Sequence, residues 1–223
     1  MLSDADPGRL TLRSASSTGV VGALDTSLGL GTDRDGVLYV PETAERSAPV
    51  IVFLHGAGGT GRRELRAVLG AADRYGAAVV APDSRATTWD RMTGRFGPDV
   101  AFISRVLDAV SERCDVDFAR LAVGGISDGA TYALSLGLTN GDLFGWVMAF
   151  SPGGAAPGAL IGRPRLYLSH GTHDAVLPID TCSRRLVPAL REGGYDVTYH
   201  EFEGGHTVPP AIADEGFSWW VSP

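Results

Sequence analysis

The sequence has little of three features that would point to particular classes of protein. Its two cysteines, Cys114 and Cys182, lack metal-ligand spacing and are too few for a disulfide scaffold. Its formal net charge is −7, whereas binding to nucleic acid or to anionic membranes relies on clustered Lys and Arg. No segment approaches about 18 uninterrupted apolar residues, and residues 1–7 carry two acids rather than a secretory apolar run. We therefore expect a cytoplasmic protein with reduced cysteines, no nucleic-acid partner and no membrane span.

Length and composition predict an ordinary globular protein. The 223 residues can bury a large core yet fit one domain, and 44% of them are apolar and 20% charged, without an internal repeat. We expect a single domain over residues 1–223, in which residues 1–35 form N-terminal edge strands and a loop. Only about fourteen residues, 151–164, separate the sixth expected strand from the seventh, so we expect no separate lid and an open site.

Short β-rich runs alternate with longer segments of helical period, which is the pattern of a mostly parallel sheet with helices on both faces. Several runs are continuously apolar, as expected for strands that are covered on both faces. The early strands lack intervening helices, which predicts an antiparallel edge. Strands are expected at residues 10–14, 36–40, 50–54, 78–81, 121–124, 145–150, 165–169 and 197–202. Helices are expected at residues 62–75, 99–114, 128–138, 181–192 and 210–221.

A serine between two glycines, in the pattern Gly125-x-Ser127-x-Gly129, follows one expected strand and precedes a helix. This context is typical of a nucleophile elbow, a strained turn that exposes a serine hydroxyl. A Cβ at either glycine would collide with neighbouring chain, which explains both glycines. The pentapeptide alone is a weak signal, because an ordinary turn with an idle serine has the same pattern. Its interpretation depends on partners elsewhere in the chain.

A serine hydroxyl needs a base within hydrogen-bond reach and a carboxylate that orients the base. Asp174 follows the seventh expected strand and His206 lies on a glycine-rich loop after the eighth. Both loops are expected at the carboxyl edge of the sheet, where ligands gather in open α/β folds. We predict Ser127 as the nucleophile, His206 as the base and Asp174 as the orienting acid. The alternatives are His170, His173, His200, Asp83, Asp180 and Asp196, of which His200 is expected to be a strand side chain and Asp180 a helix N-cap.

The third expected strand runs into a glycine-rich loop, His55-Gly56-Ala57-Gly58-Gly59. A tetrahedral intermediate needs two N–H donors, one from such a loop and one from the residue after the nucleophile. We predict the backbone N–H groups of Ala57 and Asp128 as these donors, with Gly58 as the fallback and His55 as a structural residue. The competing interpretation, a phosphate-binding loop, lacks the Lys-Ser or Lys-Thr ending and the Gly-x-Gly-x-x-Gly spacing. The Asp128 carboxylate is favoured by the helix dipole and is expected to turn away from the site.

Together these motifs resemble the serine-esterase branch of the α/β-hydrolase superfamily, the phospholipase/carboxylesterase group that includes acyl-protein thioesterases and some feruloyl and polyester esterases. The Ser, Asp, His order along the chain is the one that this fold uses. The resemblance spans nearly everything after Gly36. It is carried by His55-Gly56-Ala57-Gly58-Gly59, Ala81-Pro82-Asp83-Ser84-Arg85, Gly125-Ile126-Ser127-Asp128-Gly129-Ala130, Phe150-Ser151-Pro152-Gly153, His170-Gly171-Thr172-His173-Asp174 with Pro178, and Gly205-His206.

The resemblance implies an α/β-hydrolase fold with the triad Ser127, Asp174 and His206, a small-molecule ester substrate, and neither cofactor nor metal. It also implies that the loop of residues 83–95, with Trp89 and Met92, lines the substrate pocket together with Gly58. Acyl-protein thioesterases usually carry glutamine at the position of Asp128, and their longer lipid-covering loops are missing here, so small, medium or aromatic esters are expected. The alternatives are a lysophospholipase or acyl-thioesterase for longer chains, a peptidase of the same fold, and a non-catalytic binding protein. The chain is expected to be a monomer or a homodimer.

Overall fold

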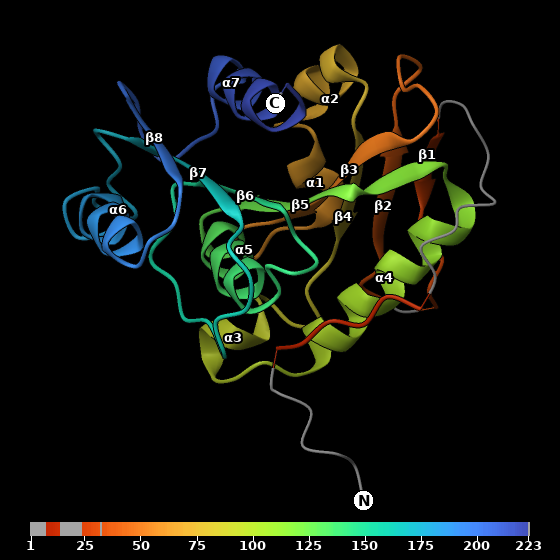
Figure 1. Cartoon of the computed structure of the whole chain (residues 1–223), viewed down its shortest axis with the longest axis horizontal. Coiled ribbons are helices and arrows are strands. Elements are labelled where there is room, and N and C mark those ends of the chain that lie inside the picture. The colour runs from red at the N-terminus through yellow and green to blue at the C-terminus, as the bar shows by residue number, and fades with distance from the viewer. Residues whose placement is uncertain (1–7, 14–23, 32, 223) are drawn as a thin grey trace, which may run out of the picture.

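The computed structural model describes residues 8–13, 24–31 and 33–222, and an eight-stranded sheet runs through its centre (Figure 1). The strands are β1 (Leu24–Ser27), β2 (Gly36–Val40), β3 (Ala48–Leu54), β4 (Ala78–Pro82), β5 (Val116–Ile126), β6 (Trp146–Phe150), β7 (Arg165–Gly171) and β8 (Val197–Phe202). Their order in the sheet is β1-β2-β4-β3-β5-β6-β7-β8. The pairs β1–β2 and β2–β4 are antiparallel, and the pairs from β4 to β8 are parallel. The predicted α/β fold with an antiparallel edge is confirmed.

Helices cover both faces of the sheet (Figure 1). The described helices are α1 (Gly61–Leu65), α2 (Leu69–Tyr75), α3 (Asp90–Thr93), α4 (Pro98–Arg113), α5 (Asp128–Thr139), α6 (Ser183–Glu192) and α7 (Pro210–Val221). One apolar cluster joins α1, α2 and α7 to the sheet, and a second joins α4, α5 and α6 to its other face. The central strands are therefore buried on both sides, which is why their sequences are apolar without alternation.

The parallel strands end in register at one edge of the sheet, which brings their outgoing loops together. Leu54 of β3 lies beside Gly125 of β5, and Phe150 of β6 lies beside Ser169 of β7. His170 and Gly171 of β7 pair in turn with the last residues of β8. The loops that follow β3, β5, β7 and β8 therefore meet at the carboxyl edge, as expected for the functional edge of such a sheet.

The strand predicted at residues 10–14 is wrong for the part that the structure describes. Residues 10–13 run along α4 instead of joining the sheet, and the backbone N–H of Thr11 donates to Ser104 Oγ at 3.1 Å. Ser14 lies outside the described residues. The side chain of Leu10 is buried in the apolar cluster that also contains residues of α4 and α5, so an apolar residue is favoured there without a strand. The first strand is instead β1, whose polar sequence Leu-Asp-Thr-Ser gave no apolar signal.

Two predicted helices begin or divide differently in the structure. The helix predicted at residues 62–75 is two helices, because residues 66–68 form a tighter turn in which Val68 N–H donates to Leu65 O. The helix predicted from residue 181 begins at Ser183, so Asp180 is not its N-cap. Asp180 forms an ion pair with Arg184 at 2.8 Å instead. The helix predicted at residues 210–221 is confirmed, and those at 99–114 and 128–138 are each confirmed to within one residue at either end.

Within the described ranges, none of the helices combines the length and the apolar character that a membrane crossing requires.

Candidate active site

Ser127 lies on a sharp turn between β5 and α5 with φ 59° and ψ −123°. A non-glycine residue with positive φ is strained, and such strain is common at nucleophile elbows. The neighbouring glycines are sterically required, because a Cβ at Gly125 would lie 2.5 Å from the Leu54 carbonyl oxygen and one at Gly129 would lie 2.1 Å from it. The predicted collision is therefore confirmed, and its origin is the end of β3.

The glycine-rich loop after β3 lies directly against Ser127. A Cβ added to Gly56 would lie 3.3 Å from Ser127 Cβ. The backbone N–H of Gly59 donates to Gly56 O at 3.0 Å, and Gly58 has φ +69°, which together define a type II turn with Ala57 at its second position. The turn therefore carries the Ala57 N–H group next to the serine.

His55 fixes the orientation of this turn from inside the protein. It is fully buried, and its Nε2 accepts a hydrogen bond from the backbone N–H of Ser84 at 2.9 Å. The proton is therefore on Nδ1, which donates to Gly56 O at 2.7 Å. Burial lowers the pKa of His55, so the neutral ring is favoured. Because the C=O and N–H of a trans peptide point in opposite directions, this bond directs the Ala57 N–H away from His55.

The two other predicted donors, Gly58 and Asp128, differ in whether the N–H group already donates a hydrogen bond within the protein. The Gly58 N–H donates to Thr87 O at 2.8 Å, so the fallback donor is already used within the protein. The Asp128 N–H belongs to the first turn of α5, whose N–H groups have no acceptor inside the helix. The Asp128 carboxylate accepts a hydrogen bond from the Thr88 hydroxyl at 2.7 Å.

Asp174 and His206 meet across the loops that follow β7 and β8. His206 Nδ1 lies 2.6 Å from Asp174 Oδ2, and the Asp174 side chain is buried while 18% of the His206 side chain is exposed. A Cβ at Gly171 would lie 2.4 Å from the carbonyl oxygens of both Gly204 and Gly205, so the two loops can approach only because this residue is glycine. Since Nδ1 is engaged, Nε2 of His206 is the nitrogen that remains for proton transfer.

The Asp174 carboxylate is held by several donors. Its Oδ1 accepts the backbone N–H groups of Val176 at 2.9 Å and Leu177 at 2.8 Å, while Oδ2 faces His206. Burial alone would raise the pKa of Asp174, but the hydrogen bonds from Leu177, His206 and Val176 lower it overall. The carboxylate is therefore ionised and fixed.

His170 lies next to the Asp174 carboxylate. In the sequence it was only an alternative candidate for the catalytic histidine. Its Nε2 lies 2.8 Å from Leu177 O and 3.3 Å from Asp174 Oδ2, and both are acceptors, so this nitrogen carries the proton. Its Nδ1 then accepts the Ser183 hydroxyl proton at 2.7 Å. Burial lowers the pKa of His170, so the ring is neutral. Both nitrogens are committed, and sequence spacing gave no signal of the Ser183 partner.

The remaining alternatives have other surroundings. His173 is exposed, and His200 on β8 contacts Glu215 of α7 at 2.9 Å. Asp196 pairs with Arg165 at 3.0 Å, and Asp83 accepts the backbone N–H of Gly61 at 2.7 Å. These contacts are structural, as expected. In the ranges that the structure describes, no cluster of three or more His, Cys, Asp and Glu side chains could hold a metal ion.

The loop of residues 83–95 differs from its expected role as a pocket wall. Trp89 is fully buried, so in this structure it offers no surface to a substrate. Its Nε1–H donates to His55 O at 2.9 Å, which places the indole behind the glycine-rich loop. Met92 is half-buried and packs against the core. The prediction that Trp89 lines the substrate pocket is therefore wrong. The sequence does not show that its ring packs in the core.

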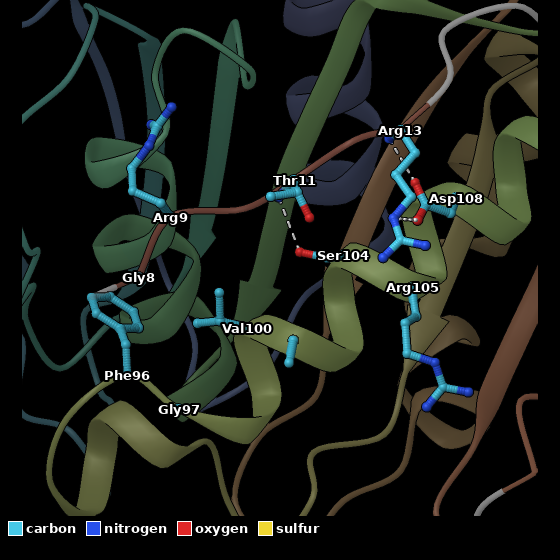
Figure 2. A pocket seen from close by; sticks show the side chains of 11 residues that line it. Gly8, Arg9, Thr11, Arg13, Phe96, Gly97, Val100, Ser104, Arg105 and Asp108 are labelled. Carbon is cyan, nitrogen blue, oxygen red and sulfur yellow. Dashed lines mark hydrogen bonds and ion pairs between the residues drawn. The ribbon is translucent and has the colours of Figure 1, made fainter. Parts of the chain in front are cut away.

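A cavity of about 610 Å³ lies away from these residues, between residues 8–13 and α4 (Figure 2). Phe96 and Val100 contribute apolar walls, and Arg13 and Asp108 lie at its rim (Figure 2). Ser127, Asp174 and His206 do not line it. The candidate site is therefore identified by the arrangement of reactive groups at the sheet edge and not by this cavity.

The chain is similar to one protein family and to several solved structures. The model of the family described as "Putative esterase" matches residues 27–186. Similar solved structures include esterase PE8 (22% identity, TM-score 0.65, 82% of this chain and 96% of that one) and FphF, a fluorophosphonate-binding serine hydrolase of Staphylococcus aureus (16%, 0.71, 91% and 100%). A third is a ferulic acid esterase from Anaeromyces mucronatus (19%, 0.63, 92% and 92%). The search of curated proteins found no match.

These similarities agree with the fold and with the expected resemblance to serine esterases of the α/β-hydrolase superfamily. The structural matches are below 25% identity and establish the fold, while the family model spans most of the chain. The chain belongs to the "Putative esterase" family and is an enzyme of the serine carboxylesterase type with the α/β-hydrolase fold.

Proposed function

We propose that the chain hydrolyses small, medium or aromatic carboxylic esters through the triad Ser127, His206 and Asp174. The observation that carries the proposal is the 2.6 Å hydrogen bond between His206 and buried Asp174, on loops at the same sheet edge as the strained Ser127 turn. A fixed carboxylate and a partly exposed imidazole with one uncommitted nitrogen are what a serine needs for activation.

In the proposed reaction, Ser127 Oγ attacks the acyl carbon while His206 Nε2 removes the hydroxyl proton. The Asp174 carboxylate stabilises the resulting imidazolium, and the N–H groups of Ala57 and Asp128 stabilise the negative oxygen of the tetrahedral intermediate. The imidazolium then gives its proton to the leaving alcohol, and an acyl-enzyme forms. Water attacks this ester with His206 again as the base, which releases the carboxylic acid and restores Ser127.

The substrate size is inferred from the segments around Ser127. Residues 151–164, between β6 and β7, contain no helix that could close over the serine. Val176, two residues after Asp174, has 65% of its surface exposed and offers an apolar contact at an open site. The fold match to a ferulic acid esterase agrees with an aromatic ester as one substrate. These features favour compact esters over long lipid chains, which need a covered tunnel.

Hydrolysis of a chromogenic ester series from acetyl to palmitoyl, run beside Ser127→Ala, tests this proposal. We expect turnover that depends on Ser127 and is highest for short acyl chains. A maximum at long chains would favour the lysophospholipase or acyl-thioesterase alternative. Absence of turnover at every length, together with no labelling of Ser127 by a fluorophosphonate, would favour a non-catalytic binding protein.

A further inference from the structure

Residues 87–89, which we call the clamp segment, contact both parts of the proposed oxyanion site. Thr87 O accepts the Gly58 N–H at 2.8 Å, and Trp89 Nε1–H donates to His55 O at 2.9 Å. Between them, the Thr88 hydroxyl donates to the Asp128 carboxylate at 2.7 Å. Three successive residues therefore join the turn that carries Ala57 to the first residue of α5.

Trp89 holds the inner end of the glycine-rich loop. Its indole N–H fixes the His55 carbonyl, and the imidazole N–H of His55 fixes the next carbonyl, that of Gly56. The other end of this second peptide is the Ala57 N–H. The indole also packs on the imidazole, with ring centroids 4.9 Å apart. Loss of the indole N–H would therefore loosen the His55–Gly56 and Gly56–Ala57 peptide groups, the second of which carries the proposed Ala57 donor.

The indole is itself held on its far side. Trp89 stacks on Tyr132 of α5, with centroids 5.1 Å apart and planes inclined by 20°. The Tyr132 hydroxyl donates to Asp90 at 3.0 Å, and Phe96 meets the Tyr132 ring edge-on at 5.8 Å. Phe96 then lines the cavity shown in Figure 2. The helix that supports the indole through Tyr132 is α5, and its first residue is Asp128, the second proposed donor.

We propose that Trp89, with the clamp segment, is a positioning residue that sets the separation and direction of the Ala57 and Asp128 N–H groups. The inference rests on the proposed function, because these groups matter only if an oxyanion forms at Ser127. Donors that are held before the reaction stabilise the transition state without reorganisation, whereas a loosened donor loses part of that effect. Ground-state binding of the ester depends little on these donors.

Trp89→Phe is the direct test, because phenylalanine keeps an aromatic ring and removes the N–H donor. Removing a whole oxyanion donor costs about 10²–10³ in kcat, so loosening one should lower kcat by about tenfold with KM nearly unchanged. The inhibition constant of a trifluoromethyl ketone, which forms an oxyanion on the serine, should weaken by the same factor. Trp220→Phe is the matched control, because Trp220 is a buried indole in α7 whose Nε1 has no hydrogen-bond partner among the described residues.

Equal losses in Trp89→Phe and Trp220→Phe would overturn the inference, because they would reflect general loss of core packing. Wild-type kcat and inhibitor affinity in Trp89→Phe would overturn it as well. Thr88→Val removes the other clamp contact from a half-buried position, and should lower kcat and inhibitor affinity together even if Trp89→Phe fails to fold. Unchanged values in Thr88→Val would then count against the inference. Ser127→Ala in the same assay distinguishes failure of this inference from failure of the proposed function. Hydrolysis that survives in Ser127→Ala would reject the proposed function itself.

Discussion

The carboxyl ends of β3 and β7 carry the same dipeptide, His55-Gly56 and His170-Gly171, and both histidines are fully buried. Each has both ring nitrogens committed, and burial lowers the pKa of each. His206, after β8, is partly exposed, and among the residues that the structure describes only its Nδ1 has a hydrogen-bond partner. Burial and hydrogen-bond partners, rather than neighbouring residues in the sequence, therefore distinguish a structural histidine from a candidate base.

Both buried histidines donate an N–H to oxygen atoms, but with different consequences for the site. His55 holds a carbonyl so that the N–H at the other end of the peptide faces outward. His170 instead directs its own N–H towards Leu177 O and the Asp174 carboxylate. The loop after β3 thus presents a donor for negative charge, and the loop after β7 surrounds a negative charge with donors.

The largest expected effect lies on the β7 side. Asp174→Asn removes the negative charge that would stabilise the His206 imidazolium and favours the wrong tautomer of the ring, so turnover should fall by about 10⁴. Steady-state hydrolysis of a chromogenic acetyl ester measures the loss. Asp196→Asn is the control, because that carboxylate pairs with Arg165 at the opposite end of the strands. A fall of less than about tenfold in Asp174→Asn would contradict the assigned role.

On the β3 side, Ala57→Pro should lower kcat by about 10²–10³, because it removes one proposed oxyanion donor. Ala57 has negative φ and occupies the second position of a type II turn, where proline fits well. The substitution therefore deletes the N–H with little change to the turn. Ala57→Ser, which keeps the N–H, should retain most activity. Equal kinetics in the two variants would show that the Ala57 N–H does not stabilise the transition state.

Because both buried histidines have lowered pKa values, we expect the free energy of unfolding to depend on pH. Their folded-state pKa values are lowered from 6.5, so below about pH 6.5 the unfolded chain binds more protons than the folded chain. The free energy of unfolding should therefore fall as the pH drops below 6.5, by at most about 1.4 kcal/mol per pH unit for each histidine. Asp174, whose pKa is lowered from 3.8, contributes in the same direction only in a more acidic range.

Urea unfolding of the wild type and of His170→Gln between about pH 8 and about pH 5 measures this dependence. The glutamine amide can replace the Nε2–H donor but does not titrate, so the variant should show the shallower decline. Identical declines in the two proteins would mean that His170 contributes no proton linkage.

The smallest effect is expected at Asp128. Asp128→Asn keeps the backbone N–H and an oxygen that can accept the Thr88 hydroxyl proton, so turnover should stay within a few fold of wild type. Kinetics on the same acetyl ester check this expectation. A loss as large as that of Ala57→Pro would mean that the carboxylate itself takes part in the reaction.

Local steric demand explains why much of the site could be predicted from the sequence. Gly125 and Gly129 are required by the close passage of the Leu54 carbonyl, and Gly171 by the contact between two loops. These constraints leave a signature at fixed spacing. The Ser, Asp, His order also follows the strand order, so Asp174 and His206 could be proposed together.

Contacts between distant segments explain what could not be predicted. Residues 10–13 have an alternating pattern that fits a strand, but their backbone pairs with side chains of α4. The partner of His170 is thirteen residues away at Ser183, and that of the Trp89 indole is thirty-four residues away at His55. No local pattern distinguishes a tryptophan that faces a substrate from one that supports a loop from behind.

In the proposed reaction, Ser127 forms an acyl-enzyme with the help of His206 and Asp174. Rapid-quench mixing of the protein with a chromogenic acetyl ester, followed by peptide mass spectrometry, tests it most directly. We expect a burst of product and an acetyl group on the Ser127 peptide in the wild type, neither of them in Ser127→Ala, and a strongly slowed burst in Asp174→Asn. Ester turnover without acetylated Ser127, or with the acetyl group on another residue, would contradict it.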